Sequence, residues 1–369
     1  MLEVALKLLK EITSHSYQAY IVGGFVRDYL LGIESNDIDI TTNATPKQIK
    51  EIFVESCLPN EDYGSVTVIL RGIRFEITTF RKETDYINNR KPSKIQYIDT
   101  LYEDLIRRDF IINTLCMNED GELLDFLGGK EDLQNRIIRT VGNAVDRFTE
   151  DSLRILRAIR FATILDFQID EDVKNAILDT KYLLVNLSYY RKKEELDKIF
   201  TSTNYKNGIK LLLELGLDQE LELFNLAKVL DTGAVSLIGI WTILDVERKY
   251  PFQKNELELI HNIKNALQVD NLDPVHLYEY GLYVSCVAAE IKHEDIKVIT
   301  ESYEKLPIKS RKEIDINSHT IMDILQRKPG KFLRGIYEDI EKAILYGYLN
   351  NSKEDICQYI MNKYNGGVL

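Results

Sequence analysis

The chain has 369 residues, of which 44% are hydrophobic and 29% are charged, and its formal net charge at pH 7 is −12. This length exceeds what one hydrophobic core usually holds, so we expect at least two domains, or one domain with a helical extension. No apolar run approaches the length that crosses a bilayer, and the N-terminus lacks the basic start, apolar run and cleavage site of a secretory signal, so we expect neither a membrane protein nor a secreted one.

The periodicity of the apolar residues changes near residue 140. Before that point, β-rich runs are separated by Gly-Gly, Asn-Asp and Arg-Gly pairs, and they cover residues 17–22, 37–41, 65–70 and 74–80. From about Asn143 onward the spacing is helical, as in Leu153, Leu156 and Ile159. The sequence therefore predicts an α+β region with a mixed sheet, followed by an all-α remainder.

The first motif is a pair of glycines between a strand and a helix. Gly23 and Gly24 follow an apolar run, and a helical pattern begins directly after them with Arg27 in its first turn. A helix that starts in this way leaves backbone N–H groups free to hold phosphate oxygens, and arginine adds a fixed fork of donors. The competing interpretation is a tight turn that needs glycine for backbone reasons alone.

The second motif is a pair of acids, Asp37 and Asp39, in a β-like run. Residues two apart on a strand point to one face, so both carboxylates can converge on divalent ions, while Ile38 and Ile40 point into a core. Two Mg²⁺ ions held in this way can promote an in-line phosphoryl displacement. Glu76, on what resembles a neighbouring strand, is a candidate third ligand. The alternative is that the two acids have no catalytic role and lie on an exposed edge strand, where their charge prevents pairing with another chain.

Residues 81–102 form a polar stretch between the strand signals and the next helix. Its length exceeds that of a hairpin turn, so we predict a mobile functional loop.

The third motif is a pair of adjacent arginines, Arg107 and Arg108, which follows this stretch. Two neighbouring positive charges are costly unless anions or carboxylates neutralise them. We take Arg108 as a nucleotide contact, with a structural salt-bridge network as the alternative.

The fourth motif lies on a predicted helix over residues 148–161. Asp151, Arg154 and Arg157 follow one another at steps of three on one face, with Leu153 and Leu156 roughly opposite. Cytosine and adenine each present an amino donor beside a ring-nitrogen acceptor, whereas guanine and uracil present the reverse order. An Asp acceptor beside an Arg donor would therefore accept C and A and reject G and U. A surface ion pair of small energy is the alternative.

The remaining polar residues predict little chemistry. The histidines have no metal-ligand spacing. The cysteines have no CxxC pair, so we expect them to be buried free thiols in a reducing cytoplasm. The acidic net charge argues against broad nucleic-acid binding, although residues 309–312 and 327–331 are local basic clusters. A solvated charged surface explains either cluster taken alone. The four cysteines are Cys57, Cys116, Cys286 and Cys357.

Together, the four motifs resemble the class II, bacterial-type tRNA nucleotidyltransferase and poly(A) polymerase family, which includes the CCA-adding enzymes. The resemblance is dense over residues 20–161 and weaker beyond. It implies a catalytic head over residues 1–140, a helical neck that recognises the base over 141–200, a helical body over 201–305 and a tRNA-binding tail over 306–369.

The resemblance also implies roles for individual residues. Asp37 and Asp39 would be the catalytic, Mg²⁺-binding acids, and Asp151 and Arg154 would recognise the base. The substrates would be CTP, ATP and the 3′ end of tRNA, with pyrophosphate released. The implied nucleotide-binding residues are Gly23, Gly24, Arg27, Arg108, Asp151, Arg154, Arg157 and Arg160.

Two positions depart from the family pattern. Asn88 stands where the family commonly has an acid, in the loop used to switch from C to A addition. Tyr190 stands where a glutamate is common, and we expect it to alter packing beneath the nucleotide pocket.

Several functions stay open at this point, including complete CCA addition, A-only or CC-only addition, and poly(A) synthesis. The acidic charge disfavours poly(A) synthesis, since binding arbitrary RNA relies on phosphate contacts. A noncatalytic tRNA-binding protein is the alternative from another class, and the oligomeric state is open.

Overall fold

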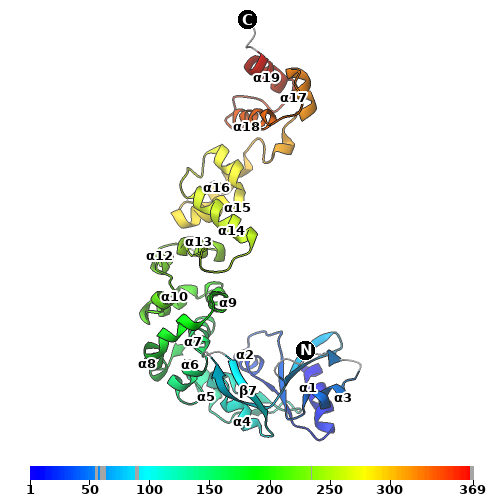
Figure 1. Cartoon of the computed structure of the whole chain (residues 1–369), viewed down its shortest axis with the longest axis vertical. Coiled ribbons are helices and arrows are strands. Elements are labelled where there is room, and N and C mark those ends of the chain that lie inside the picture. The colour runs from blue at the N-terminus through cyan, green and yellow to red at the C-terminus, as the bar shows by residue number, and fades with distance from the viewer. Residues whose placement is uncertain (55–56, 59–63, 88–90, 234, 366–369) are drawn as a thin grey trace. The chain divides into compact units, whose positions relative to one another are not determined.

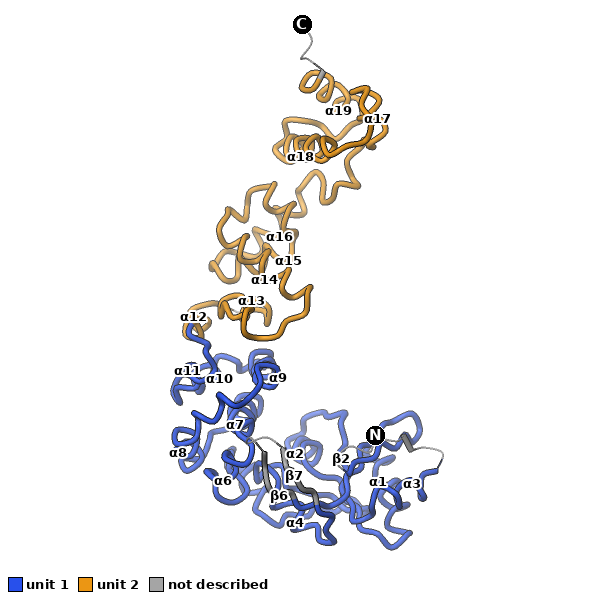
Figure 2. Tube along the Cα trace, viewed as in Figure 1, with its two compact units in different colours: residues 1–224 blue, residues 225–369 orange. Residues whose placement is uncertain are grey.

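The computed structural model describes residues 1–54, 57–58, 64–87, 91–233 and 235–365. The chain forms two compact units, Met1–Phe224 and Asn225–Leu369, which are coloured separately in Figure 2. The proposed head, neck and body boundaries at residues 140 and 200 fall inside the first unit, and the body–tail boundary at 305 falls inside the second. These three boundaries stay predictions.

Unit 1 begins with the α+β region that the sequence predicts (Figure 1). The described residues form a seven-stranded sheet of order β3-β4-β5-β2-β1-β8-β9, in which β2 and β5 are parallel and the other neighbours antiparallel. The sheet is therefore mixed. Its strands are β1 (Ala19–Val22), β2 (Asp39–Thr42), β3 (Cys57–Leu58), β4 (Ser65–Leu70), β5 (Ile73–Thr79), β8 (Cys116–Met117) and β9 (Leu123–Leu124).

Short helices accompany this sheet and complete its core. In the first helix the buried residues recur at helical spacing, which gives it one apolar face. A cluster of Val22, Phe80, Leu101, Leu105 and Cys116 packs between the sheet and α4. The helices are α1 (Leu2–Ser14), α2 (Gly24–Leu31), α3 (Pro46–Ile52), α4 (Leu101–Ile106), η2 (Ile111–Asn113) and α5 (Gly129–Asn135).

The predicted loop over residues 81–102 is instead largely a pair of strands. β6 (Arg81–Ile87) and β7 (Lys91–Tyr97) pair antiparallel, with Arg81 opposite Tyr97. The prediction of a loop was wrong for these strands because polar composition was taken as a sign of a loop, whereas backbone pairing does not require an apolar face. The functional role and the mobility of this segment stay predictions. Asn88 lies outside the described residues.

The rest of unit 1 is helical apart from one short parallel pair, β10 (Ile137–Ile138) with β11 (Gln168–Ile169). Side chains cap three of these helices at their starts, where Asn143, Asp170 and Ser188 each accept a backbone N–H. The elements are α6 (Ala144–Glu150), α7 (Leu153–Leu165), α8 (Glu171–Thr180), η3 (Lys181–Asn186), α9 (Tyr189–Phe200), α10 (Tyr205–Glu214) and α11 (Leu217–Glu220).

Unit 2 is helical throughout its described residues, so the predicted fold class is confirmed. Asp273 caps α15, which has a kink where Gly281 adopts a φ of 74°. The elements are α12 (Leu226–Leu230), α13 (Leu237–Leu244), α14 (Lys254–Ala266), α15 (Pro274–Lys292), α16 (Ile296–Glu304), η4 (Arg311–Glu313), α17 (Ser318–Leu325), α18 (Phe332–Leu345), α19 (Lys353–Ile360) and η5 (Met361–Asn365).

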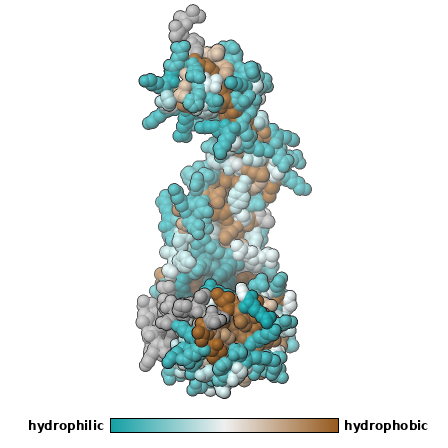
Figure 3. All heavy atoms as spheres, turned by 90° about the vertical axis from the view of Figure 1, so that its right-hand side faces the viewer, coloured by the Kyte–Doolittle hydropathy of each residue, from teal (hydrophilic) through white to brown (hydrophobic). Residues whose placement is uncertain are grey.

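The surface is polar over most of the face drawn in Figure 3, where hydrophilic residues separate the hydrophobic areas. Within the described residues, every helix is too short or too polar to cross a bilayer. Cys116 is a buried free thiol, whereas Cys286 and Cys357 are free and only half-buried, so the expectation of buried thiols holds for the first of these.

Candidate active site

The glycine turn lies between β1 and α2 as the sequence predicts. Gly23 has a φ of 81° and precedes α2, and this left-handed conformation requires glycine. A Cβ atom on Gly23 would lie 3.6 Å from Nη1 of Arg108, and one on Gly24 would lie 3.7 Å from Nη2 of Arg27. Two guanidinium groups therefore flank the start of α2, where free backbone N–H groups favour an anion.

Arg27 is held firmly beneath this turn. Its side chain is buried, and its Nε donates to Oδ1 of Asp28 at 2.8 Å while its Nη1 donates to Oδ1 of Asn113 at 2.8 Å. The ion pair with Asp28 keeps the guanidinium in one orientation. Arg27 thus enters the site as a fixed charge rather than as a flexible surface arginine.

The paired acids lie next to the glycine turn. Asp39 begins β2 and stands opposite Val22, the residue before Gly23. Asp37 lies two residues earlier, before the strand begins rather than within it as predicted. Both acids are exposed while Ile38 between them is buried, and the charge of Asp37 acts on Asp39. Glu76, on β5, is the register partner of Asp39.

Electrostatics link these acids to one another. The pKa of Asp39 is raised, first by reduced solvation, then by the neighbouring Asp37 carboxylate, and also by Glu76, whereas Arg108 opposes the rise. Among the described residues, no side-chain hydrogen bond or salt bridge occupies the carboxylates of Asp37 and Asp39. A divalent cation would relieve the repulsion between them, and two carboxylates completed by substrate oxygens are a typical Mg²⁺ environment.

The role of Glu76 as a third ligand stays a prediction. In the described part of the chain, no group of three or more Asp, Glu, His or Cys side chains is arranged to hold a metal ion. Asp37 and Asp39 therefore fit a divalent ion as an open pair that needs oxygens from the substrate.

A cavity of about 310 Å³ brings the head and neck motifs together in unit 1. It contains four residues that the sequence singled out, Arg108, Asp151, Arg154 and Arg157. Five further lining residues were not predicted as site residues, although Arg107 and Leu153 stand within the motifs; the five are Arg81, Arg107, Asp109, Leu153 and Arg191. With six arginines and two aspartates, the lining is strongly cationic.

Buried donors in this cavity lack partners. Asp104 is fully buried and pairs with both Arg107 and Arg108, so it fixes these two side chains. Even so, Nε of Arg108 and Nη1 of Arg191 are buried without a hydrogen-bond partner among the described residues. Unsatisfied buried donors are costly, and phosphate oxygens would satisfy them.

The helix that was predicted to carry the base-recognising residues is two helices. α6 ends at Glu150, Asp151 is extended with a φ of −140°, and α7 begins at Leu153. The Oδ1 of Asp151 accepts the N–H of Leu153 at 3.1 Å, a local bond that competes with helix continuation. The prediction of one continuous helix was wrong for this reason.

The predicted division into a recognition face and a packing face holds in part. Asp151, Arg154 and Arg157 all line the cavity and Leu156 is buried away from it, but Leu153, which was predicted on the packing side, lines the cavity too. Arg154 is buried with Leu153 and Leu156, and its Nη1 donates to Oε2 of Glu150 at 2.6 Å. Asp151 instead reaches the cavity from the break between helices, where its Oδ2 lies 3.4 Å from Nη2 of Arg191.

Two further neck arginines are paired with buried acids. Burial alone would raise the pKa of Asp109, but the charge and hydrogen bonds of Arg157, with those of Asn113 and the Phe110 N–H, lower this pKa to about 2. Arg160 pairs with the buried Glu195 at 3.1 Å and does not line the cavity. An acid beside two arginines in sequence was the signal that could have identified Asp109.

Tyr190 does not pack beneath the cavity. Its side chain is 62% exposed, so the expectation of altered packing there was wrong. Ser188 caps α9 and places Arg191, the next residue after Tyr190, in the first helical turn. Arg191 is the residue of this segment that lines the cavity.

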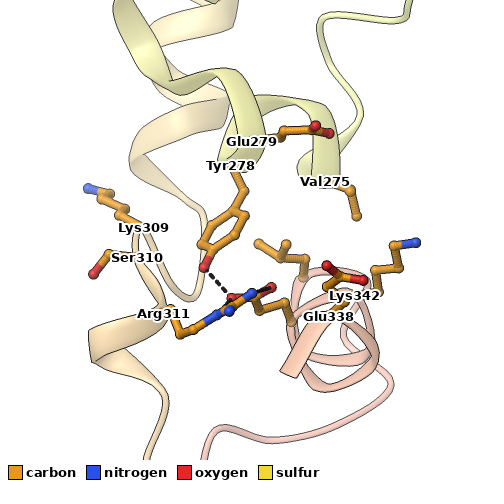
Figure 4. A pocket seen from close by; sticks show the side chains of 10 residues that line it. Val275, Tyr278, Glu279, Lys309, Ser310, Arg311, Glu338 and Lys342 are labelled. Carbon is orange, nitrogen blue, oxygen red and sulfur yellow. Dashed lines mark hydrogen bonds and ion pairs between the residues drawn. The ribbon is translucent and has the colours of Figure 1, made fainter. Parts of the chain in front are cut away.

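A separate cavity of about 580 Å³ lies in unit 2 (Figure 4). At its centre Nε and Nη2 of Arg311 donate to the two carboxylate oxygens of Glu341, and the Tyr278 hydroxyl also donates to that carboxylate. Lys309, of the basic cluster 309–312, lines the same cavity. Arg311 of that cluster is thus largely occupied in joining α15, η4 and α18.

Comparisons with known proteins agree with this arrangement. Residues 19–139 match the family described as "Poly A polymerase head domain", residues 166–223 match "Probable RNA and SrmB- binding site of polymerase A", and residues 243–360 match "tRNA nucleotidyltransferase domain 2 putative". The three matches follow one another along the chain in the order of the α+β and helical regions.

Relatives cover nearly the whole chain. It is 34% identical to the CCA-adding enzyme of Geobacillus sp. (strain WCH70), over 97% of this chain and 96% of the relative, and 35% identical to that of Ligilactobacillus salivarius (strain UCC118), over 96% and 95%. The crystal structure of the Bacillus stearothermophilus CCA-adding enzyme in complex with CTP is similar with a TM-score of 0.87 and 27% identity, covering 98% of this chain and 97% of that one. The chain therefore belongs to the CCA-adding enzymes, the bacterial-type tRNA nucleotidyltransferases.

Proposed function

We propose that the chain adds C, C and A to the 3′ end of tRNA from CTP and ATP, in the cytoplasm, and releases pyrophosphate. The position of Arg108 is the observation that carries this proposal. Arg108 flanks the glycine turn at Gly23, its charge acts on Asp39, and it lines the cavity that holds Asp151 and Arg154. One residue thus connects the phosphate turn, the paired acids and the base-recognising pair.

The triphosphate occupies the cationic part of this site. The N–H groups at Gly23 and Gly24 and the guanidinium groups of Arg27 and Arg108 hold it on the head side. Arg157, which lines the cavity, holds it on the neck side, and Arg160, which does not line the cavity, adds its positive charge there. The unpartnered Nε of Arg108 supports this assignment because a phosphate oxygen would complete its hydrogen bonding.

Base selection rests on Asp151 and Arg154. The Asp151 carboxylate accepts from the exocyclic amino group of cytosine or adenine, and the Arg154 guanidinium donates to the adjacent ring nitrogen. Guanine and uracil would bring donor against donor and acceptor against acceptor, which leaves buried polar groups unpaired. Arg191 supports this role because it lies beside the Asp151 carboxylate and limits its rotation.

Asp37 and Asp39 would hold Mg²⁺, with Glu76 as the third candidate ligand. Bound there, a pair of Mg²⁺ ions would favour the deprotonated 3′-hydroxyl of tRNA and stabilise the leaving oxygen. The 3′ oxygen forms a bond to the α-phosphorus as the bond from that phosphorus to the pyrophosphate oxygen breaks. Arg27 and Arg157 then neutralise the charge that develops on the pyrophosphate.

The helical remainder serves the tRNA. Residues 141–200 act as the neck, 201–305 as the body and 306–369 as a tail that binds tRNA. The match of residues 243–360 to a tRNA nucleotidyltransferase domain supports this assignment.

Incorporation assays test the proposal. Labelled CTP and ATP are supplied separately to tRNAs that end before the added sequence, after one cytidine and after two cytidines. We expect CTP to extend the first two and ATP the third. Extension by ATP alone would establish an A-adding enzyme, and extension by CTP alone a CC-adding enzyme. Long tails of A would establish a poly(A) polymerase. If no nucleotide were incorporated, a noncatalytic tRNA-binding protein would be the remaining alternative.

Substitutions test the two residue pairs. Asp37→Ala and Asp39→Ala should abolish incorporation while the thermal unfolding midpoint stays close to that of the unmodified chain, and retained activity would refute the metal assignment. Exchanging Asp151 and Arg154 should raise the use of GTP and UTP relative to CTP and ATP. Unchanged selectivity would refute the base-recognition assignment.

A further inference from the structure

Three arginines surround one aromatic ring in unit 1. The guanidinium carbon of Arg160 lies 4.4 Å from the centre of the Phe161 ring, that of Arg27 lies 5.2 Å away, and that of Arg157 lies 5.4 Å away. All three distances are within the range of cation–π attraction. Phe161 itself is only 8% exposed, and its ring meets that of Phe110 edge-on at 5.6 Å.

The ring connects elements that carry different parts of the site. Arg27 belongs to α2, which follows the glycine turn, whereas Arg157 and Arg160 belong to α7 with Phe161 itself. Phe110 directly precedes η2, whose Asn113 accepts a hydrogen bond from Arg27. Phe161 is therefore a contact shared by the head-side and neck-side arginines.

Separate acids do not explain why these three cations lie together. Arg27 pairs with Asp28, Arg157 with Asp109 and Arg160 with Glu195. Burial lowers the pKa of Arg160, the carboxylates of Glu195 and Asp109 oppose this change, and the charges of Arg157 and Arg27 lower the pKa further, so Arg160 is repelled by both other arginines. Each acid draws its own arginine, and the ring is the surface common to all three.

We propose that Phe161 is a positioning residue for nucleotidyl transfer, on whose ring Arg27, Arg157 and Arg160 rest in the arrangement that receives the triphosphate. This inference rests on the proposed function, in which Arg27 and Arg157 contact the nucleotide and Arg160 adds its positive charge. Arginine side chains have large rotamer entropy, and contact with a buried ring removes part of that freedom before the substrate binds. The role concerns the phosphates and not the base.

The test compares Phe161→Leu with Phe161→Tyr in the full chain. Leucine keeps an apolar side chain but removes the π-face, whereas tyrosine keeps that face. Phe148→Leu is the matched control, because Phe148 is a fully buried neck residue and, in the described part of the chain, no cation lies over its ring. Steady-state incorporation gives KM for CTP, ATP and tRNA, and product inhibition gives Ki for inorganic pyrophosphate.

We expect Phe161→Leu to raise KM for both nucleotides and Ki for pyrophosphate by about tenfold, the factor that corresponds to about 1.4 kcal/mol of cation–π attraction. The KM for tRNA and the preference for CTP over UTP should change less than about twofold. Phe161→Tyr should stay within about threefold of the unmodified enzyme, and Phe148→Leu should leave the Ki for pyrophosphate unchanged.

Two results would overturn the inference. One is a Phe161→Leu enzyme whose Ki for pyrophosphate equals that of the unmodified enzyme, and the other is a Phe161→Tyr enzyme as impaired as the leucine variant. If the leucine variant does not fold, Phe161→Met, which fills the site with a flexible apolar chain, takes its place in the same comparison. Failure of the unmodified enzyme to incorporate any nucleotide would refute the proposed function instead.

Discussion

Asp109→Asn tests the ion pair that ties the head of unit 1 to α7. Arg157 donates to Oδ2 of Asp109 through Nε at 2.7 Å and also through Nη2, and the pKa of Asp109 falls from its usual 3.8 to about 2. Because the folded pKa is below the unfolded one, the ionised carboxylate stabilises the fold above about pH 4, and this stabilisation is lost as the pH falls through 2. The difference between the two pKa values corresponds to a contribution of about 2.4 kcal/mol to the free energy of unfolding at pH 7.

The asparagine keeps the size of the side chain and its acceptor for the Phe110 N–H, but it removes the charge. We expect the variant to be about 2–3 kcal/mol less stable than the unmodified chain at pH 7, and this difference to shrink by about 1 kcal/mol between pH 7 and pH 3. Urea unfolding followed by far-UV circular dichroism measures both values. The single tryptophan, Trp241, is buried in unit 2, so its fluorescence reports on the unfolding of that unit. The urea midpoint of this fluorescence change should be the same in the variant and the unmodified chain.

A second aspartate–arginine pair serves as the matched control. Asp166 and Arg136 lie 3.1 Å apart, but both side chains are more than half exposed. Asp166→Asn should therefore cost less than about 1 kcal/mol, with no comparable dependence on pH. An Asp109→Asn defect that is equally large at pH 7 and pH 3, or no larger than that of Asp166→Asn, would refute the assignment of a strongly stabilised carboxylate.

Three further substitutions probe other parts of the chain. A Cβ on Gly208 would lie 2.5 Å from Oγ1 of Thr163, so Gly208→Ala should lower the free energy of unfolding of unit 1 by about 1–3 kcal/mol in urea titrations. Gly23→Ala forces alanine to a φ of 81°, so the free energy of unfolding of unit 1 should fall by about 1–3 kcal/mol and incorporation of CTP should fall at least about tenfold. Glu341→Gln weakens the pair with Arg311, and the tryptophan-detected unfolding of unit 2 should lose about 1–3 kcal/mol.

The local parts of the site could be predicted from sequence because short-range geometry determines them. The alternation of exposed and buried residues was predicted correctly for Asp37, Ile38 and Asp39, although β2 begins only at Asp39. The double glycine marked the turn into α2. Both features need only the periodicity of a strand and the conformational freedom of glycine. The α+β head followed by helices was predicted on the same grounds.

The parts that were missed depend on contacts distant in sequence or on local hydrogen bonds. Arg191 lies 40 residues from Asp151, and one sequence gives no sign that they meet. The break between α6 and α7 lies within a helical apolar pattern, and it exists because the Asp151 side chain accepts a backbone N–H. β6 and β7 pair through their backbones despite polar side chains, so composition predicted a loop there.

The net charge of −12 is a poor guide to how this protein meets an anionic substrate. Charges beyond about 10 Å are largely screened at 0.1 M salt, so a nucleotide in the cavity responds mainly to the six arginines that line it and to the acids paired with them. Raising the salt concentration should therefore raise the KM for CTP, because it screens a local attraction. If the overall charge governed binding, salt would screen a repulsion and lower this KM. The direction of the change in KM between about 50 and 300 mM KCl thus decides between local and global electrostatics.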